Sequence, residues 1–199
     1  METQVGILIA FEGIDGTGKT TFTHRLASYF SALGREVIVR FEPTDGPWGR
    51  KLRESAATGR MSAEEELDCL LRDRRAHVEE VILPALREGK VVILDRYYFS
   101  TMAYQGTRGI DPLEIRKRNE EFAPVPDHLI ILDLDVDAAL SRIGARGDKA
   151  NHFERRDSLQ LCRDFFLSLA DEPFAHVISV ADDVDTVARK IITAVESAK

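Results

Sequence analysis

The chain has 199 residues, of which 44% are hydrophobic and 31% are charged, a balance typical of one globular domain with a substantial core. Its formal net charge of −7 argues against non-specific nucleic-acid binding, which requires a basic surface. The two cysteines, Cys69 and Cys162, suggest neither a disulfide framework nor a zinc site. No apolar run approaches the roughly 20 residues of a membrane span and no signal peptide precedes the first apolar segment, so we expect a cytoplasmic protein.

Short apolar segments alternate along the chain with longer segments that carry helical signals. The apolar segments are rich in Val, Ile and Leu and show little polar alternation, as expected of strands buried on both faces. They are Gly6–Phe11, Glu36–Phe41, Val91–Asp95, His128–Leu134 and Ala175–Val180. This alternation predicts an α/β fold in which a mainly parallel sheet has helices on both faces.

Several helices have recognisable ends. The first helix follows a glycine-rich loop and ends at Gly34, a residue that favours helix termination. A capping box over residues 62–65 begins a long helix that Gly89 closes. Asp111-Pro112 places a capping carboxylate before a proline at the first helical position, and the last helix covers about Val184 to Glu196.

The first predicted strand leads directly into a glycine-rich loop, Gly13–Thr20, that matches the phosphate-binding pattern G-x-x-x-x-G-K-[ST] in full. Glycines allow several backbone N–H groups to point at phosphate oxygens. Lys19 adds a positive charge near the outer phosphates, the Thr20 hydroxyl can ligate Mg²⁺, and the next helix contributes its positive N-terminal end. The third glycine of the dinucleotide fingerprint G-x-G-x-x-G is missing, so the loop indicates a nucleoside triphosphate.

The strand Val91–Asp95 ends in an acid, which is typical of a carboxylate placed near a metal ion or its waters. The strand that ends near Asp133 has the same form, but only Asp95 is followed directly by an arginine, Arg96. An arginine beside a metal-binding carboxylate can hold a second anion close to the first. We therefore interpret Asp95-Arg96 as functional, the alternative being a surface salt bridge.

Several stretches, in the same order and over most of the chain, resemble the thymidylate kinase (dTMP kinase) family of P-loop nucleoside monophosphate kinases. They are Phe11–Thr21, Glu42-Pro43-Thr44, Asp73-Arg74 with His77, Pro84-Ala85-Leu86, Asp95-Arg96-Tyr97 with Ser100, Ala103-Tyr104-Gln105-Gly106, Pro126–Leu134, and Arg142 with Arg146. The resemblance implies a three-layer P-loop kinase fold with a five-stranded parallel sheet, helices on both faces and a small lid. It also implies a single kinase domain over residues 1–199, with the lid at about residues 141–154.

The activity that the resemblance implies is the ATP- and Mg²⁺-dependent phosphorylation of dTMP to dTDP, a step of dTTP synthesis. ATP would bind the residues of the loop and the start of the helix: Gly13, Ile14, Asp15, Gly16, Thr17, Gly18, Lys19, Thr20 and Thr21. Thr20 and Asp95 would hold the metal ion. The acceptor would bind Asp15, Glu42, Pro43, Leu70, Arg74, Arg96, Ser100, Tyr104 and Gln105.

Within the acceptor set the resemblance implies separate tasks. Arg96 would bind the phosphate of the acceptor, because a guanidinium offers a planar, two-pronged match to phosphate oxygens. Arg74 would contact the base or the phosphate, and Asp15 would face the 3′-hydroxyl of the deoxyribose. The base would be read through hydrogen bonds by Ser100, Tyr104 and Gln105.

The family places a catalytic arginine either in the phosphate loop or in the lid, and this loop has no arginine between Gly13 and Gly18. The resemblance therefore assigns Arg142 and Arg146 of the lid to catalysis, together with Lys19 and Arg96. Closing of the lid would also exclude water and protect ATP from hydrolysis. The alternative is a solvated helix end whose cations suit the helix dipole.

Two positions depart from the family pattern. Phe41 precedes Glu42 where the family commonly has arginine, and Arg40, one residue earlier, points to the other face of a strand. Leu70 lies four positions before Arg74, where the family commonly has an aromatic residue that stacks on thymine. Trp48 either compensates for that aromatic ring or anchors its own loop. These departures bear on base specificity more than on the reaction type.

Two other functions stay open at this point. One is a P-loop kinase for a different nucleoside monophosphate or for a deoxynucleoside. The other is a non-enzymatic nucleotide switch, although a guanine-reading Asn-Lys-x-Asp motif is missing from the sequence. For partners we expect small-molecule nucleotides, without nucleic acid or membrane, and the resemblance implies a homodimer.

Overall fold

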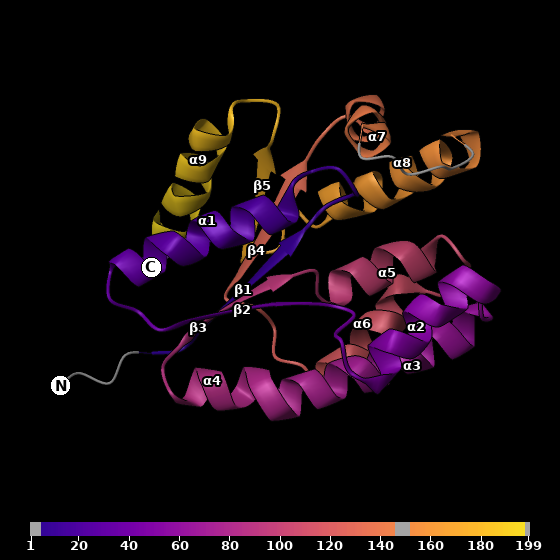
Figure 1. The fold of residues 1–199 in the computed structure, drawn as a ribbon, viewed down its shortest axis with the longest axis horizontal. Coiled ribbons are helices and arrows are strands. Elements are labelled where there is room, and N and C mark those ends of the chain that lie inside the picture. The colour runs from indigo at the N-terminus through magenta and orange to yellow at the C-terminus, as the bar shows by residue number, and fades with distance from the viewer. Residues whose placement is uncertain (1–4, 146–151, 198–199) are drawn as a thin grey trace.

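The computed structural model describes residues 5–145 and 152–197 of the chain. Its centre is a five-stranded parallel sheet with the strand order β2-β3-β1-β4-β5 (Figure 1). The strands are β1 (Ile7–Glu12), β2 (Val37–Phe41), β3 (Val91–Asp95), β4 (His128–Asp133) and β5 (Ala175–Ser179). The five predicted strands and their parallel arrangement are thus confirmed.

Helices cover both faces of this sheet. They are α1 (Lys19–Ala32), α2 (Pro47–Thr58), α3 (Ala63–His77), the π-helical turn η1 (Val78–Ile82), α4 (Leu83–Arg87), α5 (Tyr98–Gly106), α6 (Pro112–Glu120), α7 (Val136–Gly144), α8 (His152–Ser168) and α9 (Val184–Ser197). Figure 1 shows α1 and α9 on one side of the sheet and α3 and α4 on the other. The expected three-layer α/β fold is confirmed.

Local signals in the sequence fix several helix ends. Ser62 and Glu65 form the predicted capping box, with the Glu65 N–H 3.3 Å from Ser62 Oγ and the Ser62 N–H 3.1 Å from Glu65 Oε2. Asp111 Oδ1 accepts a hydrogen bond from the backbone N–H of Leu113 at 2.9 Å. Gly34 follows α1 at φ 76°, a left-handed conformation that favours glycine.

The long helix predicted between residues 62 and 89 differs in its last part from a regular α-helix. It passes from α3 through η1 into α4, and Pro84 lies in the first turn of α4. Proline has no backbone N–H and its ring clashes with the carbonyl four residues earlier, so the regular ladder cannot continue through Pro84. A wider π-type turn just before the proline is a common way for a helix to absorb this defect.

The middle of the sheet is the most deeply buried part of the core, since Ile9, Ile93 and Ile130 have no exposed surface. Strand β3 pairs with β1 in a register that sets Phe11 opposite Asp95. The loop after β1 therefore lies beside the residues that follow β3, at the carboxyl edge where ligands bind in open α/β sheets. None of the described helices is long and apolar enough to cross a membrane.

Candidate active site

The phosphate loop turns from β1 into α1 with a backbone that requires glycine. Gly13 and Gly16 have φ values of 134° and 88°. A Cβ atom at Gly13 would lie 2.4 Å from the Leu132 carbonyl oxygen, and one at Gly16 would lie 2.7 Å from the Ala139 carbonyl oxygen. The loop is thus packed against β4 and α7 at distances that no other residue type tolerates.

Lys19 is folded back onto its own loop. Its Nζ donates hydrogen bonds to the carbonyl oxygens of Gly13 and Ile14, each at 3.0 Å, and the residue is only 7% exposed. Burial, with the positive charge of Arg96, lowers the pKa of Lys19 to about 8, although nearby carboxylates oppose the shift. The ammonium group therefore sits in a site that an anion would stabilise.

The two residues predicted to hold a metal ion are brought together. The Thr20 hydroxyl donates a hydrogen bond to Asp95 Oδ2 at 2.6 Å. A hydroxyl and a carboxylate are hard oxygen ligands that fit Mg²⁺, which usually keeps waters and substrate phosphates as its other ligands. The described residues contain no cluster of three or more His, Cys, Asp or Glu side chains that could hold a metal ion.

The acid at the end of β4 has a different environment. Arg163 binds Asp133 with both prongs, Nε to Oδ1 at 2.7 Å and Nη2 to Oδ2 at 3.1 Å. Asp133 is therefore engaged in an ion pair with α8, whereas Asp95 faces the phosphate loop, as the interpretation of Asp95-Arg96 requires.

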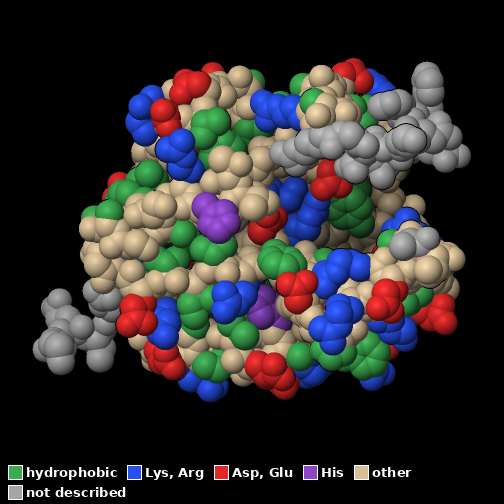
Figure 2. Space-filling model, viewed as in Figure 1, with side chains coloured by type: hydrophobic (Ala, Val, Ile, Leu, Met, Phe, Trp, Pro, Cys, Tyr) green, Lys and Arg blue, Asp and Glu red, His purple; other side chains and the backbone are tan. Residues whose placement is uncertain are grey.

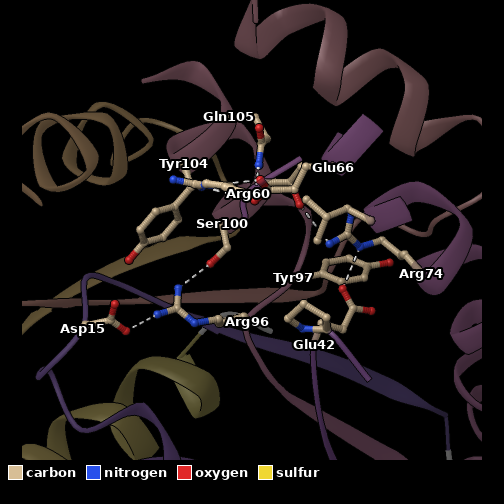
Figure 3. Close-up of a pocket in the computed structure, with 13 residues that line it drawn as sticks. Asp15, Glu42, Arg60, Glu66, Arg74, Arg96, Tyr97, Ser100, Tyr104 and Gln105 are labelled. Atoms are coloured by element: carbon tan, nitrogen blue, oxygen red, sulfur yellow. Dashed lines mark hydrogen bonds and ion pairs between the residues drawn. The ribbon is translucent and has the colours of Figure 1, made fainter. Parts of the chain in front are cut away.

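Arg96 connects the phosphate loop with the neighbouring pocket (Figure 3). Its Nη2 donates to Asp15 Oδ1 at 2.5 Å and its Nη1 to Ser100 Oγ at 2.9 Å, while the guanidinium carbon lies 5.2 Å from the centre of the Tyr104 ring. Its φ of 73° is positive, which among the described residues is shared only with glycines. Such a conformation costs about 1–2 kcal/mol and is found mainly at functional sites.

A buried glutamate holds the turn that carries Arg96. Glu12 Oε1 accepts hydrogen bonds from the backbone N–H groups of Tyr97 (2.8 Å) and Ser100 (2.9 Å), and Oε2 accepts one from the Ser100 hydroxyl (2.5 Å). Burial raises the pKa of Glu12, against the opposing effects of Ser100 and Arg96. We did not predict a role for Glu12; an acid among the apolar residues of a strand was the available signal.

We expect Glu12→Gln to lower the free energy of unfolding by about 1–3 kcal/mol, because an amide nitrogen replaces one accepting oxygen in a buried site. The turn that carries Arg96 should also loosen, and the KM for the acceptor should rise. Denaturant unfolding and steady-state kinetics measure the two effects. Glu36→Gln, at an exposed glutamate just before β2, is the control, and an unchanged midpoint with unchanged KM would contradict this role.

A cavity of about 250 Å³ lies beside Arg96 and is lined by 13 residues. The nine residues predicted for the acceptor all line it: Asp15, Glu42, Pro43, Leu70, Arg74, Arg96, Ser100, Tyr104 and Gln105. Sequence reasoning missed the other four, which are Arg60, Glu66, Tyr97 and Thr101. We call this cavity the acceptor pocket. Figure 2 shows basic and acidic side chains gathered in a hollow of the surface between α8 and α5.

One buried polar atom in the wall of the acceptor pocket, Gln105 Oε1, has no hydrogen-bond partner among the described residues. The Gln105 amide is fixed from its other end, since Nε2 donates to Glu66 Oε1 at 3.0 Å. Unpaired buried polar atoms are costly, so their presence in a pocket indicates a place where a ligand completes the hydrogen bonding.

Arg74 is held in the wall of the acceptor pocket by a buried network. Its Nε donates to Glu42 Oε2 (2.7 Å), Nη1 to Asn119 Oδ1 (2.6 Å) and Nη2 to Thr101 Oγ1 (3.1 Å). His77 Nδ1 lies 2.9 Å from the other Glu42 oxygen. Burial alone would raise the pKa of Glu42, but Arg74 and His77 outweigh it and the pKa is lowered. Three of the five N–H donors of Arg74 are engaged, which leaves two for a ligand.

The structure places one of the two predicted lid arginines. Arg142, near the end of α7, directs Nη1 to the carbonyl oxygen of Gly16 at 3.4 Å and Nη2 to that of Val180 at 3.1 Å. It therefore lies against the phosphate loop. Arg146 lies outside the described residues.

The departures from the family pattern fall in two places. Leu70 lines the acceptor pocket, whereas Arg40, Phe41 and Trp48 line a separate hollow beside α3 and do not reach that pocket. The Arg72 guanidinium lies 5.0 Å from the centre of the Trp48 ring. Trp48 therefore packs at the surface and does not replace the missing aromatic residue.

The sheet order and the phosphate loop define the chain as an α/β P-loop kinase. The family model for thymidylate kinase matches residues 11–191, and the chain belongs to the thymidylate kinase family. It is 54% identical over 185 residues, 93% of this chain and 81% of the relative, to a thymidylate kinase of Xanthomonas euvesicatoria pv. vesicatoria (strain 85-10). It is 56% identical over 164 residues, 82% of this chain and 79% of the relative, to a thymidylate kinase of Akkermansia muciniphila.

A solved structure has the same fold. The crystal structure of thymidylate kinase from Ehrlichia chaffeensis superposes with a TM-score of 0.76 at 30% identity, over 95% of this chain and 98% of that one. The P-loop kinase architecture predicted from the sequence is confirmed by this likeness.

Proposed function

We propose that the chain transfers the γ-phosphoryl group of ATP to dTMP, with dTDP and ADP as products. A phosphate oxygen of the acceptor forms a bond to the γ-phosphorus as the bond from that phosphorus to the β,γ-bridging oxygen breaks. The observation that carries the proposal is the position of Arg96, which joins Asp15 of the phosphate loop to Ser100 of the acceptor pocket. Donor and acceptor phosphates bound on the two sides of Arg96 would meet in this space.

On the donor side, Lys19 would exchange its carbonyl partners for phosphate oxygens of ATP, which would bind along Gly13–Thr21. Mg²⁺ held by Thr20 and Asp95 would neutralise charge on the phosphates when bound. Arg142 would add a further positive charge from the lid, as would Arg146. We take the lid as residues 141–154 of one kinase domain that spans residues 1–199.

On the acceptor side, the unpaired Gln105 Oε1 can accept the N3–H of thymine. Cytosine has an unprotonated nitrogen at that position. Its N3 is a hydrogen-bond acceptor and would face Gln105 Oε1, which is also an acceptor. The two unused N–H groups of Arg74 can donate to a carbonyl oxygen of the base. Arg96 would bind the acceptor phosphate, and Asp15 would face the 3′-hydroxyl.

A panel of acceptors with Mg-ATP tests this function through the ADP released in a coupled assay. We expect dTMP to be the best substrate among dTMP, dUMP, dCMP, dAMP, dGMP and thymidine. A higher kcat/KM for another monophosphate, or for thymidine, would favour a P-loop kinase of different specificity. Tight ATP or GTP binding without turnover of any acceptor would favour a nucleotide switch.

The assignment of the metal site predicts different effects at two similar strand ends. Asp95→Asn should reduce kcat by about 10²-fold and raise the Mg²⁺ concentration for half-maximal rate, because a charged ligand is lost. Asp133→Asn is the matched control, which weakens the pair with Arg163 and should cost about 1 kcal/mol of stability. Magnesium titrations of both variants measure the effect, and the same Mg²⁺ requirement in both would contradict the assignment.

We further propose that the protein is a cytoplasmic homodimer, in the compartment that holds ATP and the deoxynucleotide pool. The dimer follows from the family resemblance. Sedimentation equilibrium gives the mass in solution, and a monomer near 22.3 kDa would contradict it.

A further inference from the structure

Glu66, in the first turns of α3, lies beside Gln105 in the wall of the acceptor pocket. Its Oε1 accepts a hydrogen bond from Gln105 Nε2 at 3.0 Å. Arg60 holds both oxygens, with Nε 3.0 Å from Oε2 and Nη2 3.2 Å from Oε1, and Arg108 Nη1 also donates to Oε2. Figure 3 shows Gln105, Glu66 and Arg60 together on the side of the pocket away from Arg96. The carboxylate is therefore fixed in place by side chains from outside α3.

This carboxylate stays ionised in its half-buried position. Burial alone would raise the pKa of Glu66, but Arg60, Arg108 and Gln105 outweigh it and the pKa is lowered. An ionised carboxylate has oxygens that accept hydrogen bonds and no group that donates them. The group of Gln105 that faces Glu66 must therefore be a donor.

The requirement for a donor decides which end of the Gln105 amide is left for a ligand. A glutamine amide carries an acceptor oxygen and a donor nitrogen, which exchange places when the group turns by about 180° about its last bond. With Oε1 toward Glu66, two acceptors would face each other in a site that water hardly reaches, since Gln105 is 1% exposed. With Nε2 toward Glu66 the hydrogen bond forms and Oε1 is left for a ligand, which is the arrangement in the structure.

We propose that Glu66 is a positioning residue for base selectivity: its carboxylate holds the Gln105 amide with Oε1 available to the base, and so selects bases with a ring N–H donor. The proposal rests on the proposed function, in which Gln105 Oε1 accepts the N3–H of thymine, and it assigns the source of that selectivity. Glu66 acts through Gln105 and not by contact with the base. Without the carboxylate the amide can turn, and Nε2 can then donate to the unprotonated N3 of a cytosine.

Two acceptors that differ only at the edge read by Gln105 test the proposal. They are dTMP and 5-methyl-dCMP, which share the sugar, the phosphate and the methyl group. We expect the wild type to prefer dTMP by at least about 10³-fold in kcat/KM, because 5-methyl-dCMP leaves two acceptors facing each other. Glu66→Gln should lower this preference at least about tenfold, since an amide at position 66 can accept from Nε2 of Gln105 or donate to its Oε1 and no longer fixes its orientation.

The ratio of the two kcat/KM values distinguishes a positioning role from a structural one. A variant that only loosens the fold lowers kcat/KM for both acceptors together and leaves the ratio unchanged. Glu64→Gln removes a charge from an exposed residue of the same helical turn and is the control, with a ratio within about twofold of wild type.

Glu66→Asp is a second variant, for use if thermal unfolding shows that Glu66→Gln does not fold. It keeps the negative charge beside Arg60 and Arg108 but shortens the side chain by one CH₂ group, so the carboxylate no longer reaches Gln105. The preference for dTMP should fall by at least about threefold, the effect of losing one hydrogen bond.

A double variant tests whether Glu66 acts through Gln105. In Gln105→Leu no amide remains to be turned, so adding Glu66→Gln should change the ratio less than about twofold. A larger change there, or an unchanged preference in the folded Glu66 variants, would show that Glu66 does not act by orienting Gln105. If the wild type prefers dTMP by less than about tenfold, the inference is wrong while the phosphorylation of dTMP stands. If dTMP itself is not phosphorylated, the proposed function fails first and the inference falls with it.

Discussion

Replacing Lys19 by methionine is expected to reduce kcat about 10³-fold with dTMP and ATP. The ammonium group is the mobile positive charge of the phosphate loop, and charge neutralisation provides most of the rate enhancement in phosphoryl transfer. Methionine keeps the length and apolar stem of the side chain and removes the charge, together with the two hydrogen bonds to the carbonyl oxygens of Gly13 and Ile14. Single-turnover measurements with saturating Mg-ATP separate this loss from weaker ATP binding.

The same variant should be close to the wild type in stability at pH 7, because relief of the buried charge offsets the loss of two hydrogen bonds that contribute about 0.5–1.5 kcal/mol each. The loss of activity would then be difficult to attribute to misfolding. The pKa of Lys19 falls from 10.5 to about 8 in the folded chain, a difference that corresponds to about 3 kcal/mol at most. Below pH 8 the wild type bears the cost of a buried charge, whereas Lys19→Met does not. As the pH rises from 8 to 10.5 the folded wild type loses this proton before the unfolded chain does, so the wild type gains stability.

Denaturant unfolding of both proteins at pH 7 and at pH 10 measures this effect. The stability of Lys19→Met relative to the wild type should be higher at pH 7 than at pH 10. A variant less stable than the wild type by more than about 3 kcal/mol at pH 7 would show that Lys19 contributes to the fold as well as to catalysis.

Arg96→Ala is expected to lower kcat/KM for dTMP by about 10³-fold while the KM for ATP changes only a few-fold. The guanidinium offers two prongs to the acceptor phosphate, and truncation leaves Asp15 and Ser100 without their shared partner. Initial rates measured over a matrix of dTMP and ATP concentrations separate the two substrates. A rise in the KM for ATP as large as the loss for dTMP would place Arg96 on the donor side.

The left-handed backbone of Arg96 allows a control for Arg96→Ala. Arg96 has φ 73°, a conformation that alanine retains at a cost and glycine adopts freely. Arg96→Gly should therefore be as inactive as Arg96→Ala but more stable by about 0.5–1 kcal/mol. Equal stability of the two variants would mean that the backbone relaxes when the side chain is removed.

The sequence predicted the strands well because an apolar run is a local property of each segment. The expected burial on both faces holds for β1, β3 and β4, whereas the edge strands β2 and β5 are largely half-buried or exposed. The helix ends at Gly34 and Ser62 could be predicted for the same reason, since caps and left-handed glycines act within a few residues. The order β2-β3-β1-β4-β5 was not predicted, because it depends on pairing between distant segments. The π-helical turn before Pro84 was also missed: a proline marks a defect but does not specify how the helix absorbs it.

The residues of the acceptor pocket also differ in how far they could be predicted from the sequence. Its nine predicted residues came from the resemblance to the thymidylate kinase family, and the structure gathers them around one cavity. Arg60 and Glu66 were missed because they reach the cavity from the loop before α3 and from its first turns, where they read as ordinary surface charges. Glu12 was missed because its role is indirect, since it fixes the turn that carries Arg96.

The ion pair between Asp15 and Arg96 has a consequence for the free enzyme. Because Asp15 already holds one nitrogen of the guanidinium, an incoming phosphate competes for that nitrogen with a carboxylate that is part of the protein. The free energy lost with this ion pair is the same for every anion. The base of a nucleotide offsets the loss through its contacts in the acceptor pocket, whereas free inorganic phosphate has no base. Asp15 is thus a built-in competitor, which favours whole nucleotides over the small anions that are abundant in a cell.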